Sequence, residues 1–394
     1  MSAPPPNFPP TSLPAASSRK QRLTVVQILP ALNSGGVERG TLEVASELVR
    51  RGHRSIVIAA PGRLAKELTQ AGSQYVPWPV GKKSPLTFKW IGPLRRLLIG
   101  EKADILHARS RVPAWVAYLA WRSLPAKHRP RFITTVHALY SVSAYSGIMM
   151  RGEKLIAVSK TVHQYILDNY PRVDPADIEL IYRGIDPLEF PYGHHPEPEW
   201  IKQWHQEFPQ LRHKRPLLTL PARLTRRKGH RDFLKMLAQL HQQGIEAHGV
   251  IVGGEDPKRR AYAQQVRQDV IDLNLTNHVT FTGDRSDVRD IYAMSDIVYC
   301  LSNPAESFGR TVVEALTIGT PVIGYDLGGV GETLSELLPN GRVPTGDIQA
   351  LTDRTMRFLD HRPHVLPNTI FTREAMLDHT LALYKDMAAE NRNS

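Results

Sequence analysis

The feature that most constrains this fold is a repeated unit, in which a short apolar run is followed by a loop and an amphipathic helical pattern. Residues 23–29 form the first run, and a Gly-containing loop at 33–36 leads into residues 37–49, whose apolar side chains recur at helical spacing. Similar runs follow at 55–60, 105–106, 132–136 and 155–158. Strands that alternate with helices form a parallel sheet covered on both faces.

The alternation stops and then restarts. After the run at 178–181, the chain passes through a segment rich in Pro, His and Trp up to residue 215. New apolar runs then occur at 217–220, 249–252, 279–282, 297–301 and 321–325. A chain of 394 residues is long enough for two domains. We therefore predict an α/β protein with two tandem Rossmann-like, doubly wound domains facing across a cleft, with ligands at the carboxyl ends of the strands.

The same pattern predicts the domain boundaries. A disordered tail is expected over residues 1–21 and an N-terminal domain over 22–190. An interdomain linker at 191–215 separates it from a C-terminal domain at 216–370. Residues 371–394 are expected to form a C-terminal helix that can cross back to the N-terminal domain.

Charge and cysteine content limit the partners and the compartment. The formal net charge of +12 favours phosphate-bearing partners such as nucleotides or anionic lipid headgroups. Cys300 is the single cysteine, so a disulfide framework is excluded and a cytoplasmic setting is expected. The sequence contains neither a long apolar stretch that would span a membrane nor a signal peptide pattern.

The most specific motif lies after the run at 297–301. Glu306 and Glu314 stand eight residues apart, with Ser307, Phe308 and Gly309 at the start of the helical pattern between them, and Gly-Thr-Pro-Val follows at 319–322. The start of a helix presents backbone N–H groups that can hold an anion. For an arbitrary protein, two such glutamates would be a solvated helix face.

A basic motif follows the strand that opens the second domain. It reads Arg-Leu-Thr-Arg-Arg-Lys-Gly and runs from Arg223 to Gly229. Positioned Arg and Lys side chains at the carboxyl end of a strand can stabilise negative charge, such as that of a phosphate group, and a solvated basic loop is the alternative.

Four further residues fall in loops at strand ends. Gly35 and Gly36 occupy the first strand-to-helix turn, where the backbone can approach a phosphate or a sugar. His137 directly follows the strand at 132–136, and Arg285 follows the strand at 279–282. For Arg285, a surface ion pair with Asp287 is the alternative. The glycines do not form a Gly-x-Gly-x-x-Gly fingerprint, which argues against a Rossmann dehydrogenase.

These motifs resemble the Glu-x7-Glu, Arg-x4-Lys-Gly and Gly-Gly-x-Glu-Arg patterns of the retaining family 4 glycosyltransferases, which have the GT-B fold. The resemblance extends over nearly the whole chain. It implies an N-terminal acceptor-binding domain and a C-terminal nucleotide-sugar-binding domain. This sequence departs from the family pattern at Ala138 and Ala222, where Gly is common, and at Arg183, where Asn is usual.

The resemblance also implies roles for individual residues. Glu306 would contact hydroxyls of the donor sugar, Glu314 would accept hydrogen bonds from the ribose, and Arg223 and Lys228 would clamp the diphosphate. His137 would lie near the reacting carbon, and His107 matches another family histidine. The implied catalytic residues are Glu306, His137, Arg223 and Lys228. The implied donor-binding residues are Gly35, Gly36, Arg223, Lys228, Arg285, Glu306, Ser307, Phe308, Gly309 and Glu314.

We expect no metal site and no cofactor, with a UDP- or GDP-type nucleotide sugar as substrate. No Asp-x-Asp triplet stands at a strand end, and no His, Cys and carboxylate set has metal-ligand spacing. The expected activity is that of a retaining, metal-independent hexosyltransferase acting on a glycan or a lipid-linked glycan, as in lipopolysaccharide synthesis. A GT-B nucleotide-sugar epimerase is the alternative, and a phosphorylase would need free phosphate as acceptor.

Two questions about macromolecular partners stay open at this level. A nucleic-acid-binding protein would explain the positive charge, but the basic residues are scattered and do not form a recognisable module, so no nucleic-acid partner is expected. Residues 88–98 are basic, aromatic and amphipathic, which fits a helix lying on the inner face of a membrane and equally a helix that buries one stripe in its domain.

Overall fold

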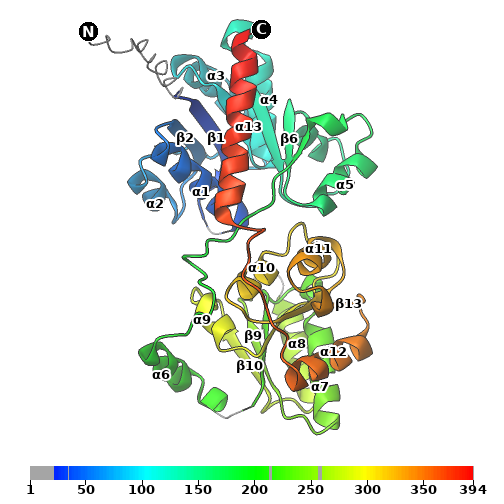
Figure 1. Ribbon diagram of the computed structural model, residues 1–394. Coiled ribbons are helices and arrows are strands. Elements are labelled where there is room, and N and C mark those ends of the chain that lie inside the picture. Colours follow the sequence, from blue (N-terminus) through cyan, green and yellow to red (C-terminus); the bar gives the residue numbers. More distant parts are fainter. Residues whose placement is uncertain (1–21, 34, 213–214, 256–259, 394) are drawn as a thin grey trace, which may run out of the picture.

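A computed structural model describes residues 22–393, apart from 34, 213–214 and 256–259. The tail predicted at 1–21 lies outside the described residues. Two lobes, each built on one sheet, are stacked along the molecule, and the chain passes between them twice (Figure 1). None of the described helices has the length and apolar run needed to cross a bilayer.

The first lobe contains a seven-stranded parallel sheet in the order β3-β2-β1-β4-β5-β6-β7. Its strands are β1 (Thr24–Ala31), β2 (Arg54–Ala60), β3 (Gln74–Val76), β4 (Ile105–Ala108), β5 (Arg131–Val136), β6 (Lys154–Ala157) and β7 (Ile178–Leu180). Its helices are α1 (Gly36–Arg50), α2 (Ala65–Gln70), α3 (Ile91–Gly100), α4 (Arg111–Arg122) and α5 (Lys160–Asn169). The 3₁₀ helices are η1 (Pro85–Trp90), η2 (Ala126–His128), η3 (Ser146–Met150) and η4 (Pro175–Asp177).

The second lobe contains a six-stranded parallel sheet in the order β10-β9-β8-β11-β12-β13. Its strands are β8 (Leu217–Pro221), β9 (His248–Val252), β10 (Val279–Gly283), β11 (Ile297–Cys300), β12 (Val322–Tyr325) and β13 (Arg342–Val343). Its helices are α7 (His230–Gln242), α8 (Arg260–Asp272), α9 (Val288–Ala293), α10 (Arg310–Thr317), α11 (Gly328–Leu337) and α12 (Ile348–Asp360). Its 3₁₀ helices are η6 (Arg226–Lys228) and η8 (Pro339–Gly341). The continuous apolar runs of the sequence become these strands because both faces of each sheet are covered.

The strand orders fix where ligands can bind. In each sheet the order reverses beside the first strand, between β1 and β4 in one lobe and between β8 and β11 in the other. Loops that follow these neighbouring strands diverge to opposite faces of the sheet and leave a crevice at the carboxyl ends. The predicted α/β class with two doubly wound sheets is confirmed.

The segment between the sheets is not extended chain. Helix α6 (Pro198–Glu207) and the 3₁₀ helix η5 (Pro209–Arg212) occupy it, and Trp204, Phe208 and Leu211 pack against β8 and β9 of the second lobe. Ile185 and Phe190 also belong to the core of the second lobe. The predicted boundaries at 190, 215 and 370 stay predictions.

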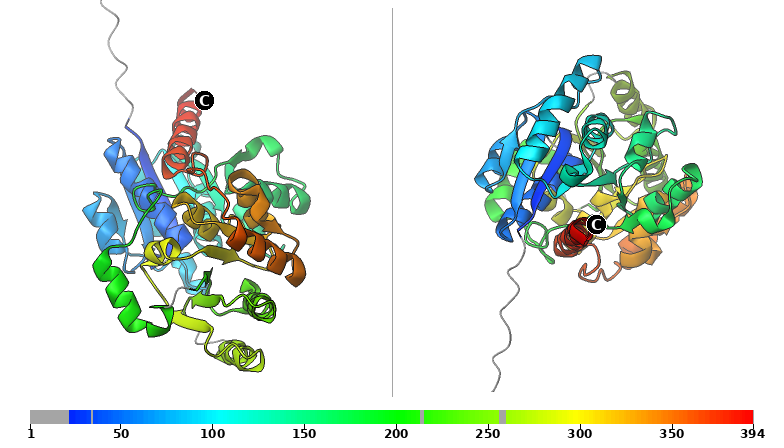
Figure 2. Two further views of the ribbon diagram at one scale, coloured as in Figure 1. Left: turned by 60° about the horizontal axis from the view of Figure 1, so that its bottom comes forward. Right: turned by 90° about the horizontal axis from the view of Figure 1, so that it is seen from above.

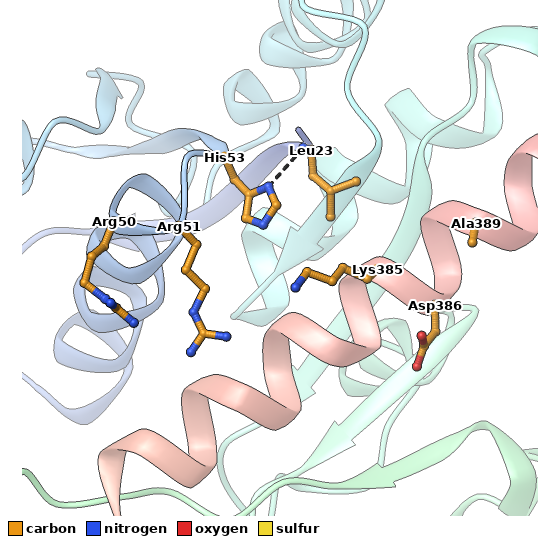
Figure 3. Close-up of a pocket in the computed structure, with 7 residues that line it drawn as sticks. All are labelled: Leu23, Arg50, Arg51, His53, Lys385, Asp386 and Ala389. Carbon is orange, nitrogen blue, oxygen red and sulfur yellow. Dashed lines mark hydrogen bonds between the residues drawn. The ribbon is translucent and has the colours of Figure 1, made fainter. Parts of the chain in front are cut away.

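The last helix, α13 (Arg373–Asn393), returns to the first lobe and lies along it (Figures 1 and 2). Leu377, Leu381 and Tyr384 join the buried cluster formed by residues of β1, β4, β5 and α1. At the amino end of β1, a cavity of about 770 Å³ remains between α13 and the end of α1 (Figure 3). It is lined by Leu23, Arg50, Arg51, His53, Lys385, Asp386 and Ala389. This cavity lies at the end of the sheet opposite to the strand-end loops that carry the sequence motifs.

Candidate active site

A polar cavity of about 330 Å³ lies at the carboxyl ends of β8 and β11, where the order of the second sheet reverses. It is lined by Arg223, Thr225, Arg227, Lys228, Ser302, Pro304, Ala305 and Glu306. The two loops that form it are joined by a hydrogen bond, because the main-chain N of Asn303 donates to the carbonyl of Arg227 at 2.9 Å. The structure thus brings together the basic motif and the first glutamate of the Glu-x7-Glu motif.

Lys228 and Glu306 form an ion pair across this cavity. Ser302 Oγ also donates a hydrogen bond to the Glu306 carboxylate. Burial alone would raise the pKa of Glu306, but Lys228 and Ser302 outweigh that effect, and the pKa is held below its usual value. Glu306 is therefore an acceptor-only carboxylate, able to bind hydroxyl groups, next to a fixed ammonium group.

Two glycines let the surrounding loops take this form. Gly229 has a φ of 74°, and a Cβ there would lie 2.3 Å from the carbonyl oxygen of Leu301. Gly309 has a φ of 80° at the start of α10, and a Cβ there would lie 3.1 Å from Cα of Val330. Any larger residue at 229 would push apart the two loops that carry Lys228 and Glu306.

Glu314 lies in α10, and its side chain is 12% exposed. Its Oε1 accepts a 2.7 Å hydrogen bond from Arg310 Nε, and Tyr292 Oη donates to its Oε2 at 3.4 Å. Burial raises the pKa of the Glu314 carboxyl, although Arg310 opposes the shift. A ribose contact by Glu314 stays a prediction, and Arg310, which the sequence reading did not single out, occupies one of its oxygens in this structure.

Ser307 and Phe308, the two residues after Glu306, have different surroundings. Ser307 Oγ donates a 2.8 Å hydrogen bond to the main-chain carbonyl of His137, so the two lobes touch one residue away from Glu306. Phe308 is buried, and its ring packs edge-on to Phe371 at 5.6 Å between centroids. The donor-binding roles of Ser307, Phe308 and Gly309 stay predictions.

In the first lobe, Arg183 connects His137 to the glycine turn. Its guanidinium donates to Nδ1 of His137 at 3.1 Å and to the carbonyl of Gly36. The guanidinium also lies over α1, because a Cβ at Gly40 would be 2.8 Å from Arg183 Nη2. Gly35, Gly36 and His137 thus meet at the carboxyl ends of β1 and β5, and Arg183 is the side chain that joins them.

The His137 imidazole is turned into the lobe. Its Nε2 is buried and has no hydrogen-bond partner among the described residues. Burial, together with Arg183 and Arg109, places the pKa of His137 well below its usual value. Because Arg183 can only donate to Nδ1, the neutral ring carries its proton on Nε2. A hollow of about 20 Å³, large enough for one water molecule, lies beside it between the first lobe and α13.

His107 is a buried structural residue within β4. Its Nδ1 lies 2.6 Å from Tyr384 Oη of α13, and its Nε2 lies 2.6 Å from Thr135 Oγ1 of β5. Both ring nitrogens are engaged, and burial lowers the pKa of this imidazole well below 6.5. His107 therefore fastens α13 to the first sheet.

Arg285 lies away from the polar cavity. It forms ion pairs with Asp287 and Glu207 at 2.7 and 2.8 Å, and its guanidinium lies 5.4 Å from the Trp204 ring centroid. The ion pair with Asp287 that the sequence offered as the alternative is present. A donor contact by Arg285 stays a prediction.

No cluster of three or more His, Cys, Asp or Glu side chains suited to hold a metal ion occurs in the described part of the chain. The positive groups at the polar cavity are instead the side chains of Arg223, Arg227 and Lys228.

Comparison with known proteins assigns both halves of the chain. Residues 34–188 match the model of Glycosyltransferase Family 4, and residues 202–368 match that of Glycosyl transferases group 1. The chain is a family 4 glycosyltransferase. It has the GT-B fold, and it uses a nucleotide sugar as donor.

This glycosyltransferase is similar along most of its length to curated relatives. It is 26% identical to N-acetyl-alpha-D-glucosaminyl L-malate synthase of Bacillus anthracis, over 84% of this chain and 85% of the relative. It is also 26% identical to phosphatidyl-myo-inositol mannosyltransferase of Mycobacterium leprae, over 82% of this chain and 84% of the relative.

Solved structures show the same architecture. A glycosyltransferase from Rickettsia africae superposes with a TM-score of 0.82 at 28% identity, covering 93% of this chain and 98% of that chain. The HepE protein of Anabaena, solved in complex with UDP-glucose, superposes with a TM-score of 0.71 at 20% identity, covering 94% of this chain and 99% of that chain. At that identity, the second likeness concerns the fold alone.

Proposed function

We propose that this enzyme is a retaining, metal-independent hexosyltransferase that moves a sugar from a UDP- or GDP-type donor to a glycan or a lipid-linked glycan. The observation that carries the proposal is the cavity in which Arg223, Arg227 and Lys228 surround Glu306 at the reversal point of the second sheet. Its positive groups suit a diphosphate, and its carboxylate suits sugar hydroxyls.

In the proposed reaction, the bond between the anomeric carbon and the diphosphate oxygen breaks. Negative charge grows on the departing diphosphate, and Arg223 and Lys228 stabilise it as it forms. The acceptor hydroxyl oxygen bonds to the same face of the sugar, and its proton passes to the departing phosphate oxygen. Fixed cations contribute most when they are already oriented, and Lys228 is oriented by Glu306 before the donor binds.

The proposed donor sugar lies between Glu306 and the loop after β5. The hydrogen bond from Ser307 to the His137 carbonyl supports this assignment, because it brings the two lobes together one residue away from Glu306. We assign sugar-hydroxyl contacts to Glu306, a contact near the reacting carbon to the His137 loop, and a backbone contact to Gly35 and Gly36. Glu314 would bind the ribose after Arg310 releases one oxygen.

The proposed acceptor is a lipid-linked or lipopolysaccharide-type glycan at the cytoplasmic face of a membrane. The name of the Mycobacterium leprae relative specifies a phosphatidyl-myo-inositol acceptor, which supports an amphiphilic acceptor for this chain as well. The UDP-glucose bound to the Anabaena protein supports a UDP sugar as the first donor to test.

A panel of UDP-, GDP- and ADP-sugars tests the donor. The true donor should raise the midpoint of thermal unfolding, and the shift should grow with its concentration. NMR of the transferred sugar should then show the donor's anomeric configuration, and added EDTA should leave the rate unchanged. An inverted product or loss of turnover with EDTA would overturn the corresponding part of the proposal. Conversion of the donor sugar without any acceptor would favour the epimerase.

A further inference from the structure

The positive charge of this enzyme is concentrated in one stretch of its sequence. Residues 71–152 contain thirteen Lys and Arg but only two acidic residues, Glu101 and Asp104, so this stretch carries a net +11 of the chain's +12. The remaining four fifths of the sequence are close to neutral. Part of this charge lies at the cavity described next, because the exposed Lys82 and Lys83 line it, whereas Arg131 is paired with Glu153 and Glu390.

Two segments within this stretch expose large apolar side chains. Leu86 and Phe88 of η1 are 76% and 44% exposed, and Val142 and Tyr145 of the loop after β5 are 57% and 37% exposed. Single exposed apolar residues are common, but a group of them around a hollow indicates an interaction site. Phe88 and Tyr145 line a cavity of about 640 Å³ together with Lys82, Lys83, Ser84, Pro85, Thr87, Val112 and Trp115. Val142 lines a second cavity, of about 480 Å³, with Ser143 and Ala144 of the same loop.

Hydrogen bonds hold both segments in place. Thr87 is buried, and its Oγ1 donates to the carbonyl of Lys82 at 2.7 Å, while Ser84 Oγ accepts from the main-chain N of Leu86 at 3.3 Å. On the other side, Trp115 Nε1 donates to the carbonyl of Tyr145 at 3.2 Å. The apolar side chains are therefore exposed by a fixed backbone.

The following helix does not share this exposure. Leu94 and Leu98 of α3 are buried in the core of the first lobe, so the apolar stripe predicted within residues 88–98 faces the protein. Leu86 and Phe88 precede α3 and point their exposed surface outward instead. A membrane contact in this region would thus use η1 and the loop after β5, and not the flat face of an amphipathic helix.

We propose that the docking face, formed by Lys82, Lys83, Leu86, Phe88, Val142 and Tyr145, binds the surface of an anionic lipid bilayer. Exposed lysines match the anionic headgroups, and the aliphatic and aromatic side chains between them suit the boundary between headgroups and acyl chains. A nucleic acid would bind the positive charges, but the exposed aliphatic side chains of Leu86 and Val142 would not contribute to that binding. The proposal deepens the proposed function, on which it rests for the lipid-linked acceptor.

The position of the docking face relates it to catalysis. The loop that carries Val142 and Tyr145 begins at His137, whose carbonyl receives the hydrogen bond from Ser307. Tyr165 Oη donates to the carbonyl of Tyr140 in this loop, and the Arg111 guanidinium lies 4.7 Å from the Tyr140 ring centroid. Binding at this face would present a headgroup to the carboxyl end of the first sheet.

Co-sedimentation of the full chain with vesicles tests the proposal. Vesicles of phosphatidylcholine alone are compared with vesicles that also contain phosphatidylglycerol, at low and at high salt. The full chain should bind the anionic vesicles at least tenfold more tightly, and high salt should weaken that binding. K82E/K83E should lower the affinity at least tenfold, and L86S/V142S at least threefold.

Matched variants on the second lobe control for charge and hydrophobicity. K202E/K235E changes two exposed lysines, and L366S changes a leucine that is 64% exposed; both variants should bind like the unmodified chain. Equal binding by K82E/K83E, or tighter binding to an oligonucleotide than to the anionic vesicles, would overturn the proposal. Donor turnover is measured in parallel. Vesicle binding without any turnover would overturn only the proposed function, while turnover without vesicle binding would overturn only the docking face.

Discussion

Tyr182 and Glu332 join the two lobes: Tyr182 Oη, in the segment after β7, donates a 2.8 Å hydrogen bond to Oε1 of Glu332 in α11. The same carboxylate accepts from the main-chain N of Lys160 and Thr161 at 2.7 and 3.0 Å, and from Thr161 Oγ1 at 2.9 Å. A side chain of the second lobe thus caps the amino end of α5 in the first lobe.

Replacing Glu332 should therefore weaken both the amino end of α5 and the contact between the two lobes. We expect E332A to lower the free energy of unfolding by about 1–2 kcal/mol, the usual cost of a lost helix cap. Differential scanning fluorimetry measures the effect. E336A is the matched control, because the contact that Glu336 makes in the described part of the chain is an exposed ion pair with Lys160 at 3.3 Å. Equal melting of the two variants would contradict the capping role.

Lys228 and Glu306 should both be needed for turnover. We expect K228A to lower kcat by roughly 10²–10³-fold, which is typical when one preorganised charge-stabilising group is removed. E306Q keeps the size of the side chain but removes the negative charge that orients Lys228, so it should also be slow. Initial rates with the identified donor measure both. K235A, on the exposed face of α7, should retain normal rates, and normal rates in K228A would refute the assignment.

Arg183 should set the protonation of His137. In R183N, which restores the residue usual in the family, the donor to Nδ1 and one nearby positive charge are lost. The pKa of His137 should then move up toward its usual value, although burial continues to hold it down. NMR titration of the histidine ring protons measures the shift. R39Q, which removes an exposed arginine paired with Glu67, should leave that titration unchanged.

Histidines whose pKa is lowered by burial should make the protein sensitive to acid. Burial is the largest cause that lowers the pKa of His53, His107, His137, His230 and His278, and for His230 the value falls to about 4. The unfolded chain takes up these protons first, near pH 6.5, so stability is complete above that pH and falls as the pH drops toward 4. Protonation of His230 alone should lower the free energy of unfolding by about 3 kcal/mol between pH 6.5 and pH 4.

Unfolding midpoints between pH 8 and pH 4 test the acid sensitivity. H230Q should flatten the lower part of that profile, because its side chain cannot be protonated. H195Q, at an exposed position, should follow the unmodified protein. A profile that stays level down to pH 4.5 would contradict the role of the buried imidazoles.

The sequence pattern predicts the longer strands of each sheet, but it does not predict the short edge strands β3 and β13. The run at 23–29 corresponds to β1, in which five of eight residues are buried, and the run at 249–252 corresponds to β9, which is buried throughout. The edge strands β3 and β13 contain only three and two residues, which is too short for an apolar period to appear. Helix α6 was missed because its ends are crowded with Pro and its packing partners, β8 and β9, come later in the chain.

The candidate site could also be predicted only in part from the sequence. Arg223, Lys228 and Glu306 could be placed together because loops after neighbouring parallel strands meet at one edge of a sheet. The pair of Arg310 and Glu314 has the spacing of adjacent residues on one helix face, a signal that could have been used. The contact of Arg183 with His137 could not be found in this way, since 46 residues separate them and only the folded sheet brings them together.

The return of α13 to the first lobe gives folding during synthesis an unusual order. Leu381 and Tyr384 fill the core beside β1 and β4, and Tyr384 is the hydrogen-bond partner of His107. While the ribosome is still translating the second lobe, the first lobe has an open apolar face where α13 will pack. The first lobe therefore emerges from the ribosome first but can complete its core only after α13 has been made. Truncation of α13, or a bulky fusion to it, would leave the core of the first lobe incomplete.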